Sequence, residues 1–278
     1  MHFGIYSVLG KGEWAKHLHQ IPEEEYYSLM EQFDPKPDWV KELVTIAKEV
    51  GCKYITLTTR HHDGFSLYDT CGLNTLDALS IYVTVWRFCV PMEGSPMYVA
   101  SEMCEIFGNH WAYAKKDLDF KSPARMIEEL AECRKYGANM LLNIGPMGDG
   151  SFRPIDAVIL GIVGEWVGYF DEAIRCPRPT GISIENKPDD FLLKEGNKYY
   201  LFCFHLPRTA NSNVDRFEDA DYRDCFHLEE KIESVVWMDN GSEVPFTQEN
   251  NKVTVYTEAY GYGSNLVVRV ARITCSIK

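Results

Sequence analysis

A helix-like segment followed at once by a short apolar run occurs twice in this chain, and this pattern constrains its fold more than any other feature. Residues 38–50 are followed by 54–58, and residues 122–137 are followed by 139–144. Gly51 and Gly137 stop the two helical patterns. Apolar runs without polar alternation are typical of parallel strands covered on both faces. The sequence therefore predicts an α/β fold, and a further helix beginning at Pro154 continues the alternation.

Polar residues follow the apolar run 54–58, where His61, His62 and Asp63 stand together before Gly64. The C-terminal ends of parallel strands are where α/β folds bind ligands. An isolated pair of histidines on a loop could equally be solvated side chains. Two further predicted strands favour a site, because His2–Val8 leads into the loop Gly12-Glu13-Trp14 and the run 139–144 ends at Gly145-Pro146.

The pattern changes after Cys176-Pro177-Arg178-Pro179 to short alternating strands. We expect strands at Tyr199–Leu206, Ser234–Met238, Lys252–Tyr256 and Asn265–Ile273, with a hairpin-type turn at Asn240-Gly241. The predicted organisation is an α/β domain over residues 1–176 and an all-β domain over residues 180–278.

Six segments, in the same order, resemble the signature segments of family 29 α-L-fucosidases. They are His2-Phe3-Gly4-Ile5-Tyr6-Ser7-Val8, Gly12-Glu13-Trp14, Thr58-Thr59-Arg60-His61-His62-Asp63-Gly64-Phe65, Glu102-Met103-Cys104, Trp111-Ala112-Tyr113 and Leu141-Leu142-Asn143-Ile144-Gly145-Pro146. The resemblance covers about residues 2–78 and 97–176, and more weakly the C-terminal part. It implies a (β/α)8-type, TIM-like catalytic barrel, a small β-sandwich behind it, and retaining hydrolysis of terminal α-L-fucose.

The chain departs from the family pattern between the histidine motif and Glu102. Where the family has further barrel strands and an Asp-Gly segment that bears the nucleophile, this chain has only Leu79 to Pro96, and residues 81–96 form an atypical junction. A barrel ending near Cys176 has about 175 residues against about 250 for a complete one, so roughly three of the eight βα units are missing. We therefore expect an incomplete TIM-like barrel, with a deletion in the catalytic domain.

The resemblance also assigns roles to individual residues. Glu102 aligns with a family glutamate that is the candidate acid/base, although a surface glutamate beside Glu105 is the simpler interpretation from sequence alone. Trp111 is placed on the leaving-group side. The fucose pocket is expected to contain His2, Glu13, Trp14, His61 and His62. The nucleophile is unknown, because neither Asp63 nor Asp149 matches the missing aspartate.

Two functions follow from this departure. In the first, the chain is a glycosidase that removes terminal α-L-fucose from a fucosylated glycan, and oligomerisation compensates for the missing nucleophile segment. In the second, it is an inactive remnant that folds as an oligomer and at most binds fucose. Homo-oligomerisation is expected in both, because an incomplete barrel leaves open strand edges and an apolar lumen to be covered.

Composition excludes several other classes of function. A net charge of −13 argues against a nucleic-acid partner, and no apolar run approaches the length of a membrane span. No signal peptide is visible, so we expect a cytoplasmic protein, although an N-terminal truncation would leave the same pattern. No cofactor or metal is expected. A zinc hydrolase built on His2, His61 and His62 is disfavoured, because no HxH or HExxH spacing is present.

Overall fold

The computed structural model describes residues 1–67, 102–209 and 223–277. These residues form two compact units. The first comprises 1–67, 103–123 and 140–164, and the second comprises 102, 124–139, 165–209 and 223–277. The predicted junction 81–96 lies outside the described residues, and the predicted division into 1–176 and 180–278 stays a prediction.

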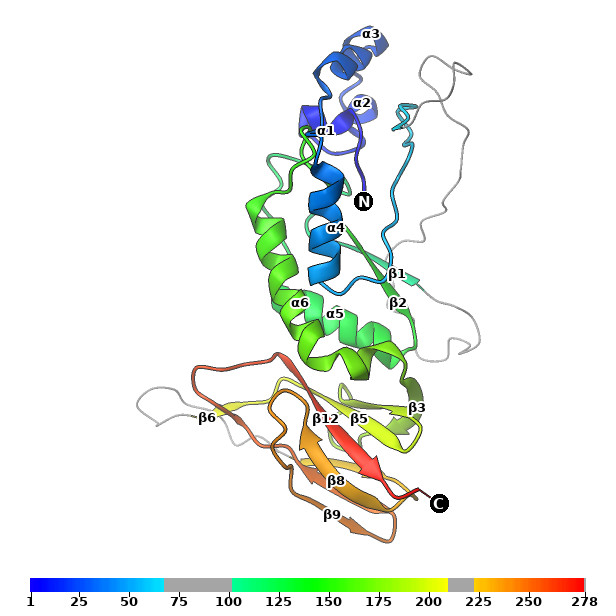
Figure 1. Cartoon of the computed structure of the whole chain (residues 1–278), viewed down its shortest axis with the longest axis vertical. Helices are drawn as coiled ribbons and strands as arrows, with labels where there is room; N and C mark the ends of the chain where they lie inside the picture. Colours follow the sequence, from blue (N-terminus) through cyan, green and yellow to red (C-terminus); the bar gives the residue numbers. More distant parts are fainter. Residues whose placement is uncertain (68–101, 210–222, 278) are drawn as a thin grey trace. The chain divides into compact units, whose positions relative to one another are not determined.

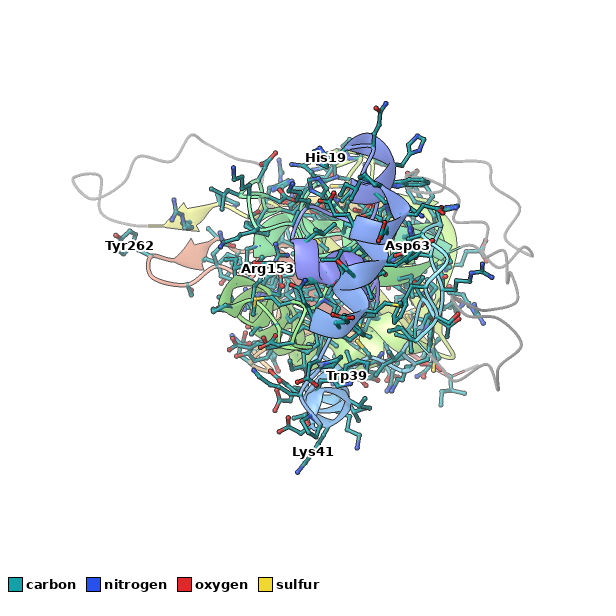
Figure 2. All side chains as sticks on the ribbon, turned by 90° about the horizontal axis from the view of Figure 1, so that it is seen from above. His19, Trp39, Lys41, Asp63, Arg153 and Tyr262 are labelled. Atoms are coloured by element: carbon teal, nitrogen blue, oxygen red, sulfur yellow. The ribbon has the colours of Figure 1, made fainter. Side chains whose placement is uncertain are left out.

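The first unit begins with short helices and continues into one long amphipathic helix (blue in Figure 1). These elements are α1 (Tyr6–Leu9), α2 (Ala15–Leu18), α3 (Glu23–Tyr27), the 3-10 helix η1 (Ser28–Gln32) and α4 (Trp39–Glu49). The helix predicted over 38–50 is confirmed as α4, which buries Leu43 in a cluster with Met1, Phe3 and Phe152. Lys41, on the same helix, points away into solvent (Figure 2).

Two helices and two short strands complete the α/β part of the chain. These are β1 (Glu102–Ile106), α5 (Pro123–Lys135), β2 (Asn139–Asn143) and α6 (Pro154–Arg175). Strands β1 and β2 form a two-stranded sheet. The predicted helix starts at Pro123 and Pro154 are correct, because proline at a first helical position gives up no backbone hydrogen bond. Phe170 has non-helical dihedral angles and kinks α6.

Two strand predictions at the N-terminus are wrong. Residues 6–9 form helix α1, and the only β-bridge in the segment 2–8 joins His2 to Thr58. The run 54–58 is not buried on both faces, because Ile55 is 41% and Leu57 is 38% exposed. The backbone hydrogen bonds described for this run join Thr56 and Thr58 to Met1, and residues 54–58, which lie within the described part of the chain, form no strand.

The second unit contains antiparallel sheets (yellow to red in Figure 1). A five-stranded sheet has the order β3-β4-β5-β12-β8, and a three-stranded sheet has the order β7-β10-β9. Strand β6 pairs with β11 in parallel. The strands are β3 (Arg178–Ser183), β4 (Phe191–Glu195), β5 (Lys198–Phe204), β6 (Arg208–Thr209), β7 (Arg223–His227), β8 (Ile232–Trp237), β9 (Phe246–Glu249), β10 (Lys252–Tyr256), β11 (Tyr260–Gly261) and β12 (Val268–Cys275).

The two larger sheets share one hydrophobic core, as the sheets of a β-sandwich do. Leu201 and Ile273 of the five-stranded sheet lie in the same buried cluster as Phe226, Val253 and Val255 of the three-stranded sheet. All four predicted strands of this region are present with shifts of a few residues at their ends. The turn at Asn240-Gly241 is also present, with Gly241 at a φ of 72°. Across the described residues, no helix is long and apolar enough to cross a membrane.

Candidate functional site

The first two residues of the chain lie between two other backbone segments of the first unit. Thr58 N donates a hydrogen bond to Met1 O at 3.0 Å, and the amino group of Met1 donates to Thr56 O at 2.7 Å. On the other side, His2 N donates to Ile144 O at 3.0 Å. This arrangement brings the end of the run 54–58, the side chain of His2 and the end of β2 to one place.

Five of the predicted site residues have their rings in mutual contact there, and we call them the ring cluster: His2, Trp14, His61, His62 and Trp111. His61 is central, with its ring centroid 5.7 Å from His2, 5.5 Å from Trp14 and 4.8 Å from His62. The Trp14 ring stacks on His62 at 4.6 Å, and His2 lies 5.1 Å from Trp111. The structure therefore brings together residues from four of the six motifs.

Glu13, the remaining predicted pocket residue, fixes the two loops that carry the tryptophans. Its side chain is buried, and its Oε2 accepts a hydrogen bond from Ala112 N at 3.0 Å. This contact ties the loop of Trp14 to the loop of Trp111. Gly12 precedes Glu13 with a φ of 85°, and a Cβ at this position would meet the His110 ring at 2.6 Å, so the turn requires glycine. Trp14 itself is 43% exposed and presents an open aromatic surface.

Asp63 holds the loop that carries the two histidines. Its Oδ2 accepts a hydrogen bond from Tyr26 Oη at 2.7 Å, and its Oδ1 accepts one from Phe65 N at 3.1 Å. The hydroxyl of Tyr27 donates to the Asp63 carbonyl oxygen at 2.9 Å. Burial raises the pKa of the Asp63 carboxyl, against the lowering effect of the Tyr26 hydrogen bond. Asp63 (labelled in Figure 2) is thus a structural residue of the loop, with both oxygens in use.

Burial keeps the imidazoles of His2 and His61 uncharged. The pKa of His2 falls to about 4, mainly because burial penalises its charged form. The pKa of His61 falls to about 3 for the same reason, with added repulsion from His2 and His62. Both rings are therefore neutral at physiological pH, and each has one nitrogen that donates and one that accepts.

Two buried polar atoms beside this cluster have no hydrogen-bond partner among the residues that the structure describes. They are His61 Nδ1 and the hydroxyl of Tyr6, whose ring lies 5.5 Å from His61. Burial, followed by the nearby charges of Asp63 and Glu13, raises the pKa of Tyr6, so its hydroxyl stays protonated. An unpaired buried polar group costs about 1–3 kcal/mol, and a bound polar group that pairs with these two atoms would remove that cost.

The candidate acid/base, Glu102, has a different setting. It is exposed at the start of β1, and its Oε2 accepts a hydrogen bond from Asn139 Nδ2 at 2.7 Å. Asp149 accepts hydrogen bonds from the backbone and hydroxyl of Ser151 and pairs with Lys36 at 3.1 Å, and the Ser151 hydrogen bonds hold its pKa at about 2. None of these contacts involves a residue of the ring cluster.

Two residues at the site were not predicted as functional. Tyr6 contributes the unpaired hydroxyl, and Asn143 lies with its Oδ1 at 2.7 Å from His2 Nδ1. Asn143 is a polar residue near the end of the apolar run 139–144, and this position is a sequence signal that could have identified it. Over the described ranges, the side chains close enough to share a metal ion are Asp190, Cys203 and Asp224, and the three histidines do not form such a group.

Comparison with solved structures identifies the same fold in α-L-fucosidases. An α-L-fucosidase isoenzyme 1 from Paenibacillus thiaminolyticus matches with a TM-score of 0.78 at 17% identity, over 99% of this chain and 96% of that chain. A family 29 α-L-fucosidase from Bacteroides thetaiotaomicron matches with a TM-score of 0.79 at 17% identity, over 99% and 91%. The mixed α/β architecture with an additional β domain is therefore shared with these proteins.

Comparison of sequences gives the family. Human tissue α-L-fucosidase is 31% identical over 119 residues, which are 41% of this chain and 25% of that protein. The mouse protein is 38% identical over 118 residues, 41% of this chain and 26% of that protein. The alignments thus span about a quarter of the length of these relatives. The family model for α-L-fucosidase matches residues 1–75 and 92–172, more than half of the chain. The chain belongs to the α-L-fucosidase family of glycosidases.

Proposed function

We propose that the chain is an α-L-fucosidase-type glycoside hydrolase that removes terminal α-L-fucose from glycans by a retaining mechanism. The observation that carries this proposal is the ring cluster with its two unpaired buried atoms, His61 Nδ1 and the Tyr6 hydroxyl. Sugar hydroxyls both donate and accept hydrogen bonds, so they would satisfy these atoms. The exposed face of Trp14 would pack on the apolar face of the sugar ring.

The charge state of the site fits a neutral substrate. With pKa values of about 4 and about 3, His2 and His61 carry no charge at physiological pH. A fucosyl group is uncharged, and two neutral imidazoles bind hydroxyls without the desolvation cost of a buried charge. An anionic ligand would gain no ion pair from these two rings.

A retaining mechanism needs two carboxyl groups about 5 to 5.5 Å apart, one as nucleophile and one as acid/base. We propose Glu102 as the acid/base. Asp63 and Asp149 are already engaged by Tyr26 and by Ser151 and Lys36, so neither supplies the nucleophile. We propose instead that this carboxylate comes from a neighbouring copy of the chain.

The arrangement of backbone segments supports an incomplete barrel as the basis of that oligomer. The segments lie in the order β1, β2, residues 1–2 and residues 56–58, joined by sheet pairing and by backbone hydrogen bonds. In a closed barrel the last strand lies beside the first, as β2 lies beside residues 1–2. Among the described segments, residues 56–58 end this order, and a second copy would cover the partly exposed side chains of Ile55 and Leu57.

A second function is favoured by the surroundings of Glu102. Its Oε2 is engaged by Asn139 at the start of the β1–β2 sheet, whereas Trp111 follows the end of β1 and Asn143 ends β2. A chain whose Glu102 carboxyl is held by Asn139 in this way, and which has no nucleophile of its own, would bind fucose without hydrolysing it. Loss of a nucleophile normally costs many orders of magnitude in rate.

Release of the aryl group from an aryl α-L-fucoside distinguishes the two functions. Purified chain would be separated by size exclusion, and each fraction assayed beside Glu102→Gln and a matched control, Glu24→Gln, an exposed glutamate on α3. If the chain is a hydrolase, we expect activity in an oligomeric fraction. This activity should be lost in Glu102→Gln and kept in Glu24→Gln. Absence of activity in every fraction, with L-fucose still bound, would leave the binding function. A monomer across a wide concentration range would contradict the shared nucleophile.

A further inference from the structure

Asn143 makes two side-chain hydrogen bonds that together fix which way its amide points. It is buried at the end of β2, and its Nδ2 donates to the carbonyl oxygen of Trp111 at 2.6 Å. A carbonyl oxygen only accepts, so the atom facing it must be the amide nitrogen. The amide oxygen is therefore the atom that lies 2.7 Å from His2 Nδ1.

We infer that Asn143 is a positioning residue that fixes His2 in the tautomer with its proton on Nδ1, so that Nε2 is left as a hydrogen-bond acceptor. An amide oxygen accepts and has no proton to give, so Nδ1 must be the donor in this contact. This inference rests on the proposed function, in which His2 lines the sugar pocket.

The surroundings of His2 support a neutral ring with one fixed proton. Burial lowers the pKa of His2 to about 4, so the imidazole has a single ring proton at physiological pH. Its backbone is held by the hydrogen bond from His2 N to Ile144 O, one residue from Asn143, and its ring lies 5.1 Å from the Trp111 ring. Among the described residues, no side chain or backbone group is hydrogen-bonded to His2 Nε2.

The fixed tautomer of His2 restricts which ligand group can bind at Nε2. A group bound at Nε2 must donate a hydrogen bond, which a sugar hydroxyl does and an ether or carbonyl oxygen does not. Asn143 thus selects a free hydroxyl at this position of the sugar without touching it. Removal of the amide oxygen would let the proton move to Nε2, and an acceptor would become a donor.

Nitrogen NMR of the histidine rings tests the tautomer directly. In ¹⁵N-histidine-labelled full chain at pH 7, we expect His2, assigned by its loss in His2→Gln, to show a protonated Nδ1 and an unprotonated Nε2. This measurement needs no change at Asn143. A protonated Nε2 on His2 would overturn the inference. In Asn143→Leu, which has a similar shape and no acceptor, we expect a mixture of tautomers. Asn139→Leu, at the other end of β2, should keep the unchanged pattern.

Titration of the same samples with L-fucose links the tautomer to binding. We expect Asn143→Leu to weaken the affinity for L-fucose by about tenfold, as loss of one hydrogen bond to a ligand does. Asn139→Leu should bind L-fucose like the unmodified chain. Equal affinity in all three would overturn the role of Asn143 in selecting the ligand. Failure of the unmodified chain to bind L-fucose, with His2 still in the expected tautomer, would refute the proposed function and limit Asn143 to fixing the ring.

Discussion

Replacement of Asp190 by asparagine is predicted to stabilise the protein, and to do so by more at pH 8 than at pH 6. Asp190 and Asp224 are both buried in the second unit, and Lys187 Nζ lies 2.7 Å from Asp224 Oδ1 and 4.0 Å from Asp190 Oδ2. The thiol of Cys203 donates to Asp224 Oδ2 at 3.4 Å. One ammonium group cannot neutralise two buried carboxylates, so burial and the charge of Asp224 raise the pKa of Asp190 to about 8.

The magnitude follows from linkage between protonation and folding. Between its ordinary pKa of 3.8 and about 8, Asp190 binds a proton in the folded protein and releases it in the unfolded chain. The free energy of unfolding therefore falls as the pH rises, by about 1.4 kcal/mol per pH unit, and the fall ends above pH 8. From pH 6 to pH 8 the ionisation of Asp190 is expected to lower the free energy of unfolding by about 2 kcal/mol. The value is smaller than two full pH units would give, because the dependence on pH weakens near the pKa of the folded protein.

Urea unfolding at pH 6 and pH 8, followed by circular dichroism, measures this effect as a difference between variants. Asparagine reproduces the protonated carboxyl, since its oxygen accepts from Phe204 N, as Asp190 does at 2.8 Å, and its amide donates toward Asp224. The stability gain of Asp190→Asn over the unmodified chain should grow by about 2 kcal/mol between the two pH values. Asp189→Asn, the exposed neighbour, is the matched control and should show no such growth. An equal stability gain at both pH values would show that the pKa of Asp190 is not raised in the folded protein.

Three further predictions concern single contacts. Gly145→Ala places a Cβ at 2.6 Å from the backbone nitrogen of Tyr113, so it should lower the thermal midpoint of unfolding and weaken L-fucose binding. The control Gly161→Ala, which has open space around the added Cβ, should do neither. Trp166→Phe removes the buried hydrogen bond from Nε1 to Val268 O at 2.7 Å and should cost about 2 kcal/mol in urea unfolding; an unchanged midpoint would contradict this. Asp149→Asn should leave L-fucose affinity unchanged in calorimetry, and a loss of binding would return Asp149 to the site.

The long helices could be predicted from the sequence because their start and stop signals are local. Pro123 and Pro154 open α5 and α6, and Gly137 follows α5 at a φ of 69°. Strands of the second unit were predictable for the same reason, through alternation and turn residues. The run 2–8 was misread because a short apolar segment fits a buried helix as well as a strand, and here Ile5 and Tyr6 are buried at the start of α1.

The composition of the site could be predicted, but the roles within it could not. The motifs gave the members of the ring cluster, which the fold brings into contact. The hydrogen bond between His2 and Asn143 spans 141 positions of sequence, and no local pattern reveals such a pair. The unpaired Tyr6 hydroxyl was missed because a lack of partners is a property of the packed structure. The role of Glu102 stays a prediction for the same reason, since it depends on the distance between two carboxyl groups.

Calorimetric titration with L-fucose, of the unmodified chain and of His61→Ala, tests whether the ring cluster binds fucose. The ring cluster is centred on His61, whose buried Nδ1 has no hydrogen-bond partner in the described part of the chain, so the ligand should supply one. We expect saturable binding at one site, weakened by about tenfold or more in His61→Ala while the far-ultraviolet circular dichroism is unchanged. Absence of binding, or equal binding by both proteins, would contradict the assignment of this cluster as a fucose site.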